Sequence, residues 1–176
     1  TTLYQYFFIC NLMFLTGFLD DIKIKVSPSK RLLLMIFSLF FSIYFMSVEI
    51  YNVDIPFLLD FLKIDIFSSI FVLLCFLFII NGANLIDGFN GLLTINLIII
   101  NSILLYINIS NGNNEFSVFL IAQLIILLSF LLFNFPNAKI FLGDSGSYLI
   151  GSLVALNSII TNNLNPNYSS FFFCTL

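Results

Sequence analysis

Long apolar segments alternate with short polar connectors along the chain. A helix needs about 20 mostly apolar residues to cross the hydrocarbon core of a bilayer. Six segments approach this length: residues 3–19, 32–48, 66–80, 92–109, 118–135 and 148–160. A further apolar segment begins near Ser169. Because unpaired backbone amides are costly in lipid, these segments are predicted to be helices. We expect an all-α, polytopic transmembrane helical bundle, with about six complete spans and a truncated seventh, as a single membrane-embedded domain over residues 1–176.

The connectors alternate between the two sides of the membrane. One side receives residues 20–31, 81–91 and 136–147, and the other receives 49–65, 110–117 and 161–168. The first side carries five of the six basic residues: Lys23, Lys25, Lys30, Arg31 and Lys139. Basic residues concentrate in cytoplasmic loops, so this side is predicted to be cytoplasmic. On the other side, apolar and charged residues interleave between 54 and 65, which predicts a short amphipathic helix on the outer surface.

The composition agrees with a membrane protein. The chain is 60% apolar and only 9% charged, and its mean hydropathy is +1.10, whereas soluble domains are about a quarter charged. Asparagine is frequent even inside apolar segments. We attribute this first to the general amino-acid composition of the source organism's proteins and only second to function. Cys10, Cys75 and Cys174 lack metal-ligand or redox spacing and are expected to be small buried hydrophobic residues.

The sequence begins at Thr1 and ends in an apolar run, so we expect an internal fragment of a longer protein.

The first acidic cluster follows the first apolar segment, in the sequence GFLDDIK. Asp20 and Asp21 are adjacent, and carboxylates this close raise each other's pKa unless a cation or a donor compensates. A divalent metal or a nearby lysine would do so, and one carboxylate could act as a general base. The alternative is that these acids, with Lys23 and Lys25, mark the membrane boundary.

The second cluster, NGANLIDGFNG, places Asn81, Asn84 and Asp87 three residues apart, on one face of a helical turn. Amide side chains both donate and accept hydrogen bonds, which suits recognition of a base or a sugar. Gly88 and Gly91 would let the backbone turn or approach a ligand closely. A simple helix-breaking loop would explain the glycines but not the Asn–Asn–Asp row.

The third cluster, NFPNAKIFLGDSGS, opens the segment that begins at Tyr148. Free N–H groups and the positive end of a helix favour phosphate at such a place. Asp144 is a hard oxygen ligand suited to Mg2+, which usually takes one or two carboxylates plus substrate phosphates. Asp144 could instead be a helix cap. All three clusters lie on the predicted cytoplasmic side, so four carboxylates could converge there: Asp20, Asp21, Asp87 and Asp144.

Three ordered segments, GFLDDIKIK, NGANLIDGFNGL and FNFPNAKIFLGDSGSYLIG, resemble the polyprenyl-phosphate N-acetylhexosamine-1-phosphate transferases, glycosyl transferase family 4. The resemblance implies an enzyme of the bacterial cytoplasmic (inner) membrane whose active site faces the cytoplasm. It would use Mg2+ to transfer a sugar-1-phosphate from a UDP-sugar to undecaprenyl phosphate and release UMP, the first membrane step of cell-envelope polysaccharide or peptidoglycan synthesis. A homodimer is compatible with this reading, and no nucleic-acid partner is expected.

The resemblance also implies roles for individual residues. Asp20 matches the base that deprotonates the lipid phosphate, Asp21 its catalytic neighbour, and Asp144 the Mg2+ ligand. Asp87 matches a catalytic residue of the nucleotide pocket, and Phe141 an aromatic that stacks on uracil. The remaining expected substrate-binding residues are Asn81, Asn84, Asn90, Asn134, Ser145 and Gly146.

The sequence departs from the family pattern at Asn90, where many members carry a second aspartate. An asparagine there is more similar to the branch that serves surface-polysaccharide synthesis than to the muramoyl branch of cell-wall synthesis. We also expect an early loop with a lysine and a late loop with histidines outside this chain, which would correspond to the third through eighth spans of a ten- or eleven-span protein.

An ion-coupled transporter also holds carboxylates in a helical bundle, usually near mid-membrane on broken helices. Here the acids lie at the ends of the segments. The aspartate motifs of transferases that act on CDP-alcohols or prenyl diphosphates have different spacing. A non-catalytic scaffold would require every inner acid to be a boundary marker.

Overall fold

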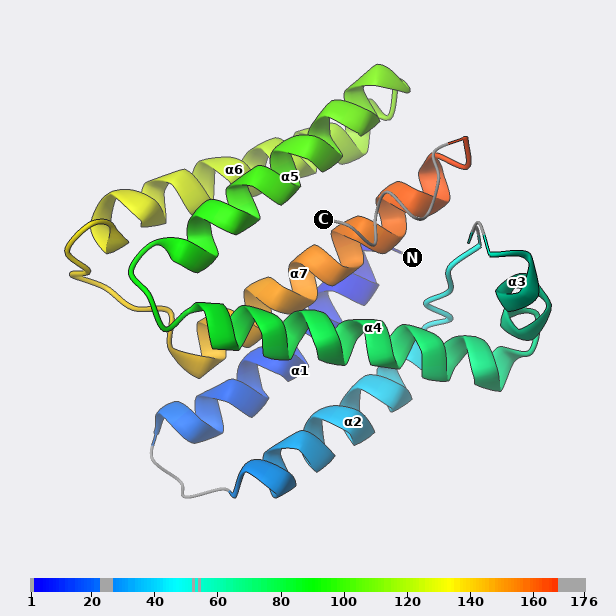
Figure 1. Cartoon of the computed structure of the whole chain (residues 1–176), viewed down its shortest axis with the longest axis horizontal. Coiled ribbons are helices and arrows are strands. Elements are labelled where there is room, and N and C mark those ends of the chain that lie inside the picture. Colours follow the sequence, from blue (N-terminus) through cyan, green and yellow to red (C-terminus); the bar gives the residue numbers. More distant parts are fainter. Residues whose placement is uncertain (1, 23–26, 52, 54, 168–176) are drawn as a thin grey trace.

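The computed structural model describes residues 2–22, 27–51, 53 and 55–167, and in these residues all regular structure is helical (Figure 1). The described helices are α1 (Thr2–Asp21), α2 (Pro28–Phe45), α3 (Pro56–Leu62), α4 (Asp65–Ile86), α5 (Leu92–Ser110), α6 (Asn114–Asn134) and α7 (Gly143–Leu164). The predicted all-α class is confirmed. The segment expected to begin near Ser169 lies outside the described residues, as do Cys174, Lys23 and Lys25.

Within the described residues, four helices are long and apolar enough to cross a membrane: α2, α4, α5 and α6. The other two long helices, α1 and α7, have 20 and 22 residues and carry more polar side chains, so the predicted count of six spans stays a prediction. Helix α7 begins at Gly143, five residues before the apolar segment that predicted it. As a result, the Gly-Asp-Ser-Gly-Ser sequence forms the first turn of this helix.

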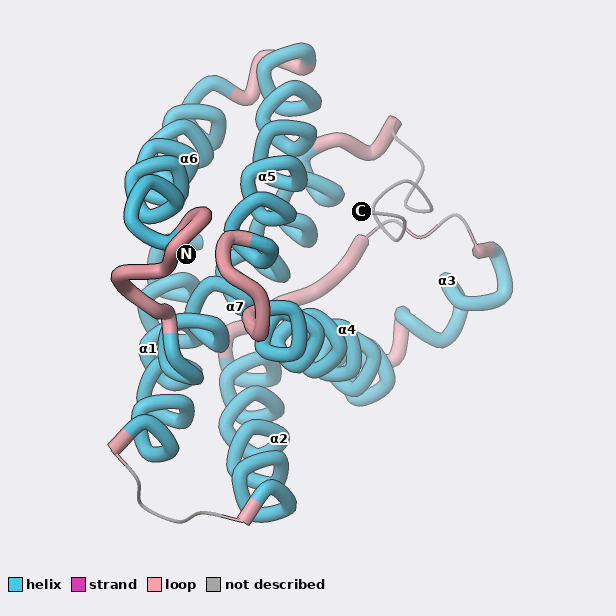
Figure 2. Tube along the Cα trace, turned by 60° about the vertical axis from the view of Figure 1, so that its left-hand side comes forward, coloured by secondary structure: helices cyan, strands magenta, loops and turns pink. Residues whose placement is uncertain are grey.

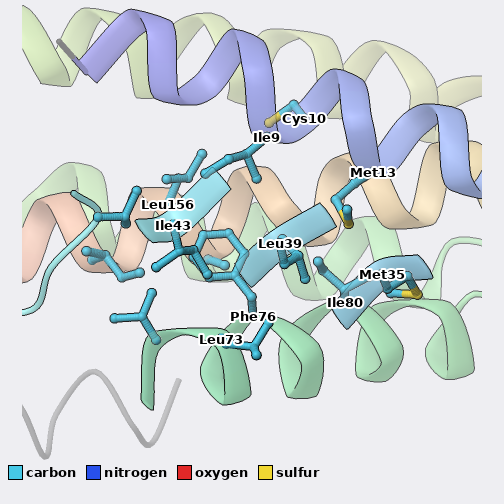
Figure 3. Close-up of a cluster of buried hydrophobic side chains, with 14 of the residues drawn as sticks. Ile9, Cys10, Met13, Met35, Leu39, Ile43, Leu73, Phe76, Ile80 and Leu156 are labelled. Atoms are coloured by element: carbon cyan, nitrogen blue, oxygen red, sulfur yellow. The ribbon is translucent and has the colours of Figure 1, made fainter. Parts of the chain in front are cut away.

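Helix α7 lies at the centre of the bundle and packs against α1, α4 and α5 (Figure 1). Small residues allow the close approach. A Cβ atom at Gly151 would lie 3.0 Å from the Cα of Ile80 in α4, and such small residues are what permits tight helix pairs in lipid. The main apolar core fills the space between α1, α2, α4 and α7, with Ile9, Met35 and Phe76 among its buried side chains (Figure 3).

A buried polar network crosses the same bundle. The Asn157 side chain of α7 is fully buried and accepts a hydrogen bond from the Tyr6 hydroxyl of α1 at 2.6 Å. Its amide donates to Asn101 of α5 at 2.9 Å and to Gln123 of α6 at 2.7 Å. The side chain of Asn157 therefore connects α7 to three other helices. At least some of the asparagines in the apolar segments thus have a structural role.

The outer face of the bundle is strongly apolar. Large side chains such as Phe78, Leu85 and Leu132 are about four-fifths exposed, as expected for surfaces that face lipid. The helix predicted between residues 54 and 65 is confirmed as α3, which lies against the start of α4 at the edge of the molecule (Figure 2). Cys10 is buried, as expected, and Cys75 is half-buried.

Candidate active site

The three polar clusters meet at one end of the bundle. The ends of α1, α4 and α6 and the starts of α2, α5 and α7 lie together there (Figure 1). The alternation of the segments predicted this arrangement, because two long helices separate each cluster from the next. The end that carries α3 lies on the opposite side of the molecule.

The centre of the site is an arginine between two aspartates. Arg31, in the first turn of α2, donates from Nη1 to Oδ2 of Asp144 at 2.8 Å, and the same nitrogen donates to Oδ2 of Asp20. The three side chains are between 23% and 31% exposed, so water only partly screens the ion pairs. The guanidinium carbon also lies 5.7 Å from the centroid of the buried Tyr148 ring. Helices α1, α2 and α7 are thus joined by one cation.

Asp21 has a different environment from its neighbour. Its Oδ1 accepts the backbone N–H of Asp144 at 3.0 Å, and its Oδ2 accepts the N–H and the hydroxyl of Ser145 at 3.0 and 2.5 Å. Burial raises the pKa of Asp21, but these hydrogen bonds outweigh it and hold the pKa below its usual value. Asp21 therefore caps α7 from another helix, and two N–H groups that we expected to be free for phosphate have a protein acceptor.

Two glycines make this contact between α1 and α7 possible. Gly143 has φ +66°, and a Cβ atom there would lie 2.8 Å from Oδ2 of Asp21. Gly17 packs directly on the backbone of Asp144 and Ser145, where a Cβ atom would overlap backbone atoms. Any larger residue at either position would separate Asp21 from the start of α7.

Asn84 connects α4 to the acidic centre. Its amide donates to Oδ1 of Asp144 at 2.7 Å and to the hydroxyl of Ser147 at 3.0 Å. Burial, together with the nearby charge of Asp20, raises the pKa of Asp144 although Asn84 and Arg31 oppose the change. Asp87 follows α4 directly, and burial together with the charge of Asp144 raises its pKa to about 6.

Other predicted substrate-binding residues hold the protein itself together. Asn81 donates to the Leu77 carbonyl of its own helix at 2.7 Å. Buried Asn134 accepts the N–H of Gly91 at 2.6 Å and donates to the Ile140 carbonyl at 2.8 Å, while Asn90 donates to the Pro136 carbonyl at 3.1 Å. Asn90 and Asn134 therefore tie the loop after α4 to the loop after α6, and a direct substrate contact stays a prediction for all three.

The last two predicted residues lie near the start of α7. The Phe141 ring is 72% exposed, which leaves its faces accessible for the predicted stacking. A Cβ atom at Gly146 would lie 2.9 Å from Cβ of Leu142, so this glycine permits close packing in the first turn of α7.

The oxygen atoms of the site suit Mg2+. In the described part of the chain there is no group of three or more His, Cys, Asp or Glu side chains that could hold a metal. Mg2+ does not require such a group, because it commonly uses one or two carboxylates and completes its shell with water and substrate phosphates. Oδ2 of Asp20 and Oδ2 of Asp144 already converge on one cationic atom, Nη1 of Arg31. These two carboxylates are the residues that would hold the ion.

Sequence reasoning missed three residues of this site. Arg31 was used only to assign the cytoplasmic side, and Ser147 and Tyr148 were given no role. The available signal was a basic residue that begins an apolar segment on the same side as the acidic clusters, because such a residue is positioned to pair with them.

Comparison with known proteins identifies the family of this chain. Phospho-N-acetylmuramoyl-pentapeptide-transferase from Clostridium perfringens (strain 13 / Type A) is 35% identical over 152 residues, which cover 82% of this chain and 48% of the relative. The protein of the same name from Leuconostoc mesenteroides subsp. mesenteroides is 37% identical over 107 residues, 61% of this chain and 33% of the relative. The chain spans about half the length of the Clostridium relative. The sequence pattern of glycosyl transferase family 4 matches residues 3–162. The predicted resemblance is confirmed, and the chain belongs to glycosyl transferase family 4.

Proposed function

We propose that the protein transfers a sugar-1-phosphate, with N-acetylhexosamine-1-phosphate as the expected group, from a UDP-sugar to undecaprenyl phosphate and releases UMP. The observation that carries the proposal is the convergence of Asp20 and Asp144 on Arg31, with Asn84 bonded to Asp144, at one end of an apolar helical bundle. A reaction between a lipid phosphate and a nucleotide diphosphate needs such a site, because anionic oxygens must be brought together and their charge balanced. The excess of basic residues at this end supports a location at the cytoplasmic face of the bacterial inner membrane.

Each residue of the site has a separate role in the proposed reaction. Asp144 would hold Mg2+ together with Asp20, and Asn84 orients the Asp144 carboxylate through its hydrogen bond to Oδ1. Mg2+ supplies neutralisation of the charge that develops on the leaving phosphate. Asp20 accepts the proton of the lipid phosphate and prepares its oxygen for attack. Asp21, held by Asp144 and Ser145, positions the start of α7.

Asp87 and Phe141 would serve the nucleotide. A carboxyl group whose pKa is about 6 can exchange a proton near neutral pH, which fits a role for Asp87 in the reaction. The exposed ring of Phe141 would stack on uracil. Both relatives named above carry the muramoyl name, so peptidoglycan synthesis is the pathway class favoured by similarity, while the Asn90 difference keeps surface-polysaccharide synthesis as the alternative.

The test is UMP release from a UDP-N-acetylhexosamine and undecaprenyl phosphate by the complete protein in detergent or membranes. We expect Asp144→Asn to abolish Mg2+-dependent transfer, and Asp20→Ala to lose turnover while it largely keeps nucleotide binding. Asp60→Asn is the matched control, because Asp60 is exposed in α3 and pairs with Lys63 at the opposite end of the molecule. Near-normal turnover of the Asp144 variant would refute the metal assignment, and an ion-coupled transporter would release no UMP at all.

A further inference from the structure

Arg31 occupies the position where the two carboxylates of the candidate metal site converge. One nitrogen, Nη1, contacts Oδ2 of Asp20 and Oδ2 of Asp144, whereas the other oxygen of Asp144 is bonded to Asn84. A divalent cation held by both carboxylates would use the same two Oδ2 atoms. Because Nη1 fills the position between these two oxygens, a metal ion bound there and the present position of Arg31 exclude each other.

We propose that Arg31 is a displaceable counter-cation, which neutralises Asp20 and Asp144 in the metal-free protein and is released by the metal to bind a substrate phosphate. The inference rests on the proposed function. The charges favour the exchange, because one arginine leaves two carboxylates with a net charge of about −1, whereas a divalent ion balances them and frees a positive guanidinium. A guanidinium forms paired hydrogen bonds to phosphate oxygens, so the released group matches an anionic substrate.

Tyr148 provides a second position for the released guanidinium. The aromatic face that Arg31 covers is a favourable site for a cation, and it remains when the carboxylates are taken by metal. The Tyr148 hydroxyl is fully buried and has no hydrogen-bond partner in the described part of the chain. A buried hydroxyl without a partner is costly, and a guanidinium that moves along the ring would supply a donor to it. The ring thus keeps Arg31 inside the site after it leaves the carboxylates.

The experiment measures metal binding separately from catalysis. Mn2+ titrations of the purified complete protein without nucleotide, followed by the EPR signal of free Mn2+, give the dissociation constant of the site. We expect Arg31→Gln to bind Mn2+ roughly tenfold more tightly than the wild type while UMP release falls and KM for undecaprenyl phosphate rises. Lys30→Gln is the matched control, since it removes one positive charge from an exposed neighbouring residue and should change the Mn2+ constant less than about twofold.

Each outcome decides between the two roles of Arg31. If Arg31 only held the carboxylates in a binding geometry, Arg31→Gln would bind Mn2+ more weakly or equally, and the proposal would be overturned. If that variant does not fold, Arg31→Lys replaces it, because a single ammonium bridges the carboxylates less well and should tighten Mn2+ binding by a smaller factor. Absence of UMP release by a wild type whose Asp144-dependent Mn2+ site is intact would instead refute the proposed function and leave the exchange standing.

Discussion

Substitution of Gly17 by alanine tests whether the contact between α1 and α7 positions the site. The added Cβ atom would lie 2.5 Å from the carbonyl carbon of Asp144 and from the amide nitrogen of Ser145. Ordinary contacts begin near 3.4 Å, so the two helices must separate by about 1 Å. The obstructing atoms are backbone atoms, and no side-chain rotation can relieve the overlap. Overpacking of this kind costs about 1–3 kcal/mol.

The catalytic consequence should exceed the loss of stability. A shift of about 1 Å would lengthen the hydrogen bonds from Asp21 to the N–H groups of Asp144 and Ser145, now 3.0 Å, to about 4 Å. The same movement would carry Asp20 away from Asp144. A misplacement of this size in a positioned site can reduce turnover by roughly 100-fold.

Gly82→Ala is the matched control for this prediction. Gly82 lies in α4 in the same region of the bundle, and a Cβ atom there would meet no atom within 4 Å. Its replacement should stabilise the helix by up to about 1 kcal/mol and leave UMP release within about twofold. The assay compares kcat/KM and Tm of both variants in the complete protein. Wild-type turnover and Tm for Gly17→Ala would refute the reasoning, because the contact would then tolerate the added carbon.

Two asparagines allow further tests away from the reacting groups. Asn157→Leu removes hydrogen bonds to three helices, and at about 0.6 kcal/mol for each interhelical bond in lipid the unfolding free energy should fall by about 2 kcal/mol, seen as a lower Tm. Asn96→Leu, whose amide bonds the Leu92 carbonyl of its own helix, should leave Tm nearly unchanged, and equal effects of the two would contradict the network. Asn134→Ala should release the bond to Gly91, cost about 1–3 kcal/mol and speed proteolysis of the adjoining loops; unchanged cleavage would show that those loops are held by other contacts.

The sequence predicted the positions of the long helices and the side on which their connectors meet, because membrane helices can be recognised from the apolar composition of each segment. Apolar length located the long helices, and the alternation of connectors brought the three clusters to one end. The one small difference has a local cause. Helix α7 starts at Gly143, because Asp21 of another helix accepts its first N–H groups, and no single-segment pattern contains that acceptor. The short helix α3 follows the predicted alternation of apolar and charged residues.

The pairing inside the site could not be read from the chain. Arg31 and Asp144 are 113 positions apart, and their contact depends on how α2 and α7 cross. The residue pattern by itself did not distinguish the environments of the adjacent aspartates. The helix turns them about 100° apart, toward an arginine in one case and toward backbone N–H groups in the other. Asn90 and Asn134 were expected to bind substrate, but their side chains bond backbone groups of neighbouring loops. The sequence alone does not show whether a polar side chain bonds the protein backbone, a ligand or water.

The different environments of Asp20 and Asp21 bear on how the reaction can be arranged. Asp21 uses both oxygens on α7, and its lowered pKa makes it a weak acceptor of protons. Asp20 contacts Arg31 through Oδ2, so in the proposed exchange a metal ion would take that oxygen and Oδ1 would be the atom that receives a proton. A base must be free to receive a proton, whereas a residue that fixes a helix must stay bonded. The geometry therefore favours Asp20 as the base and Asp21 as the positioning residue.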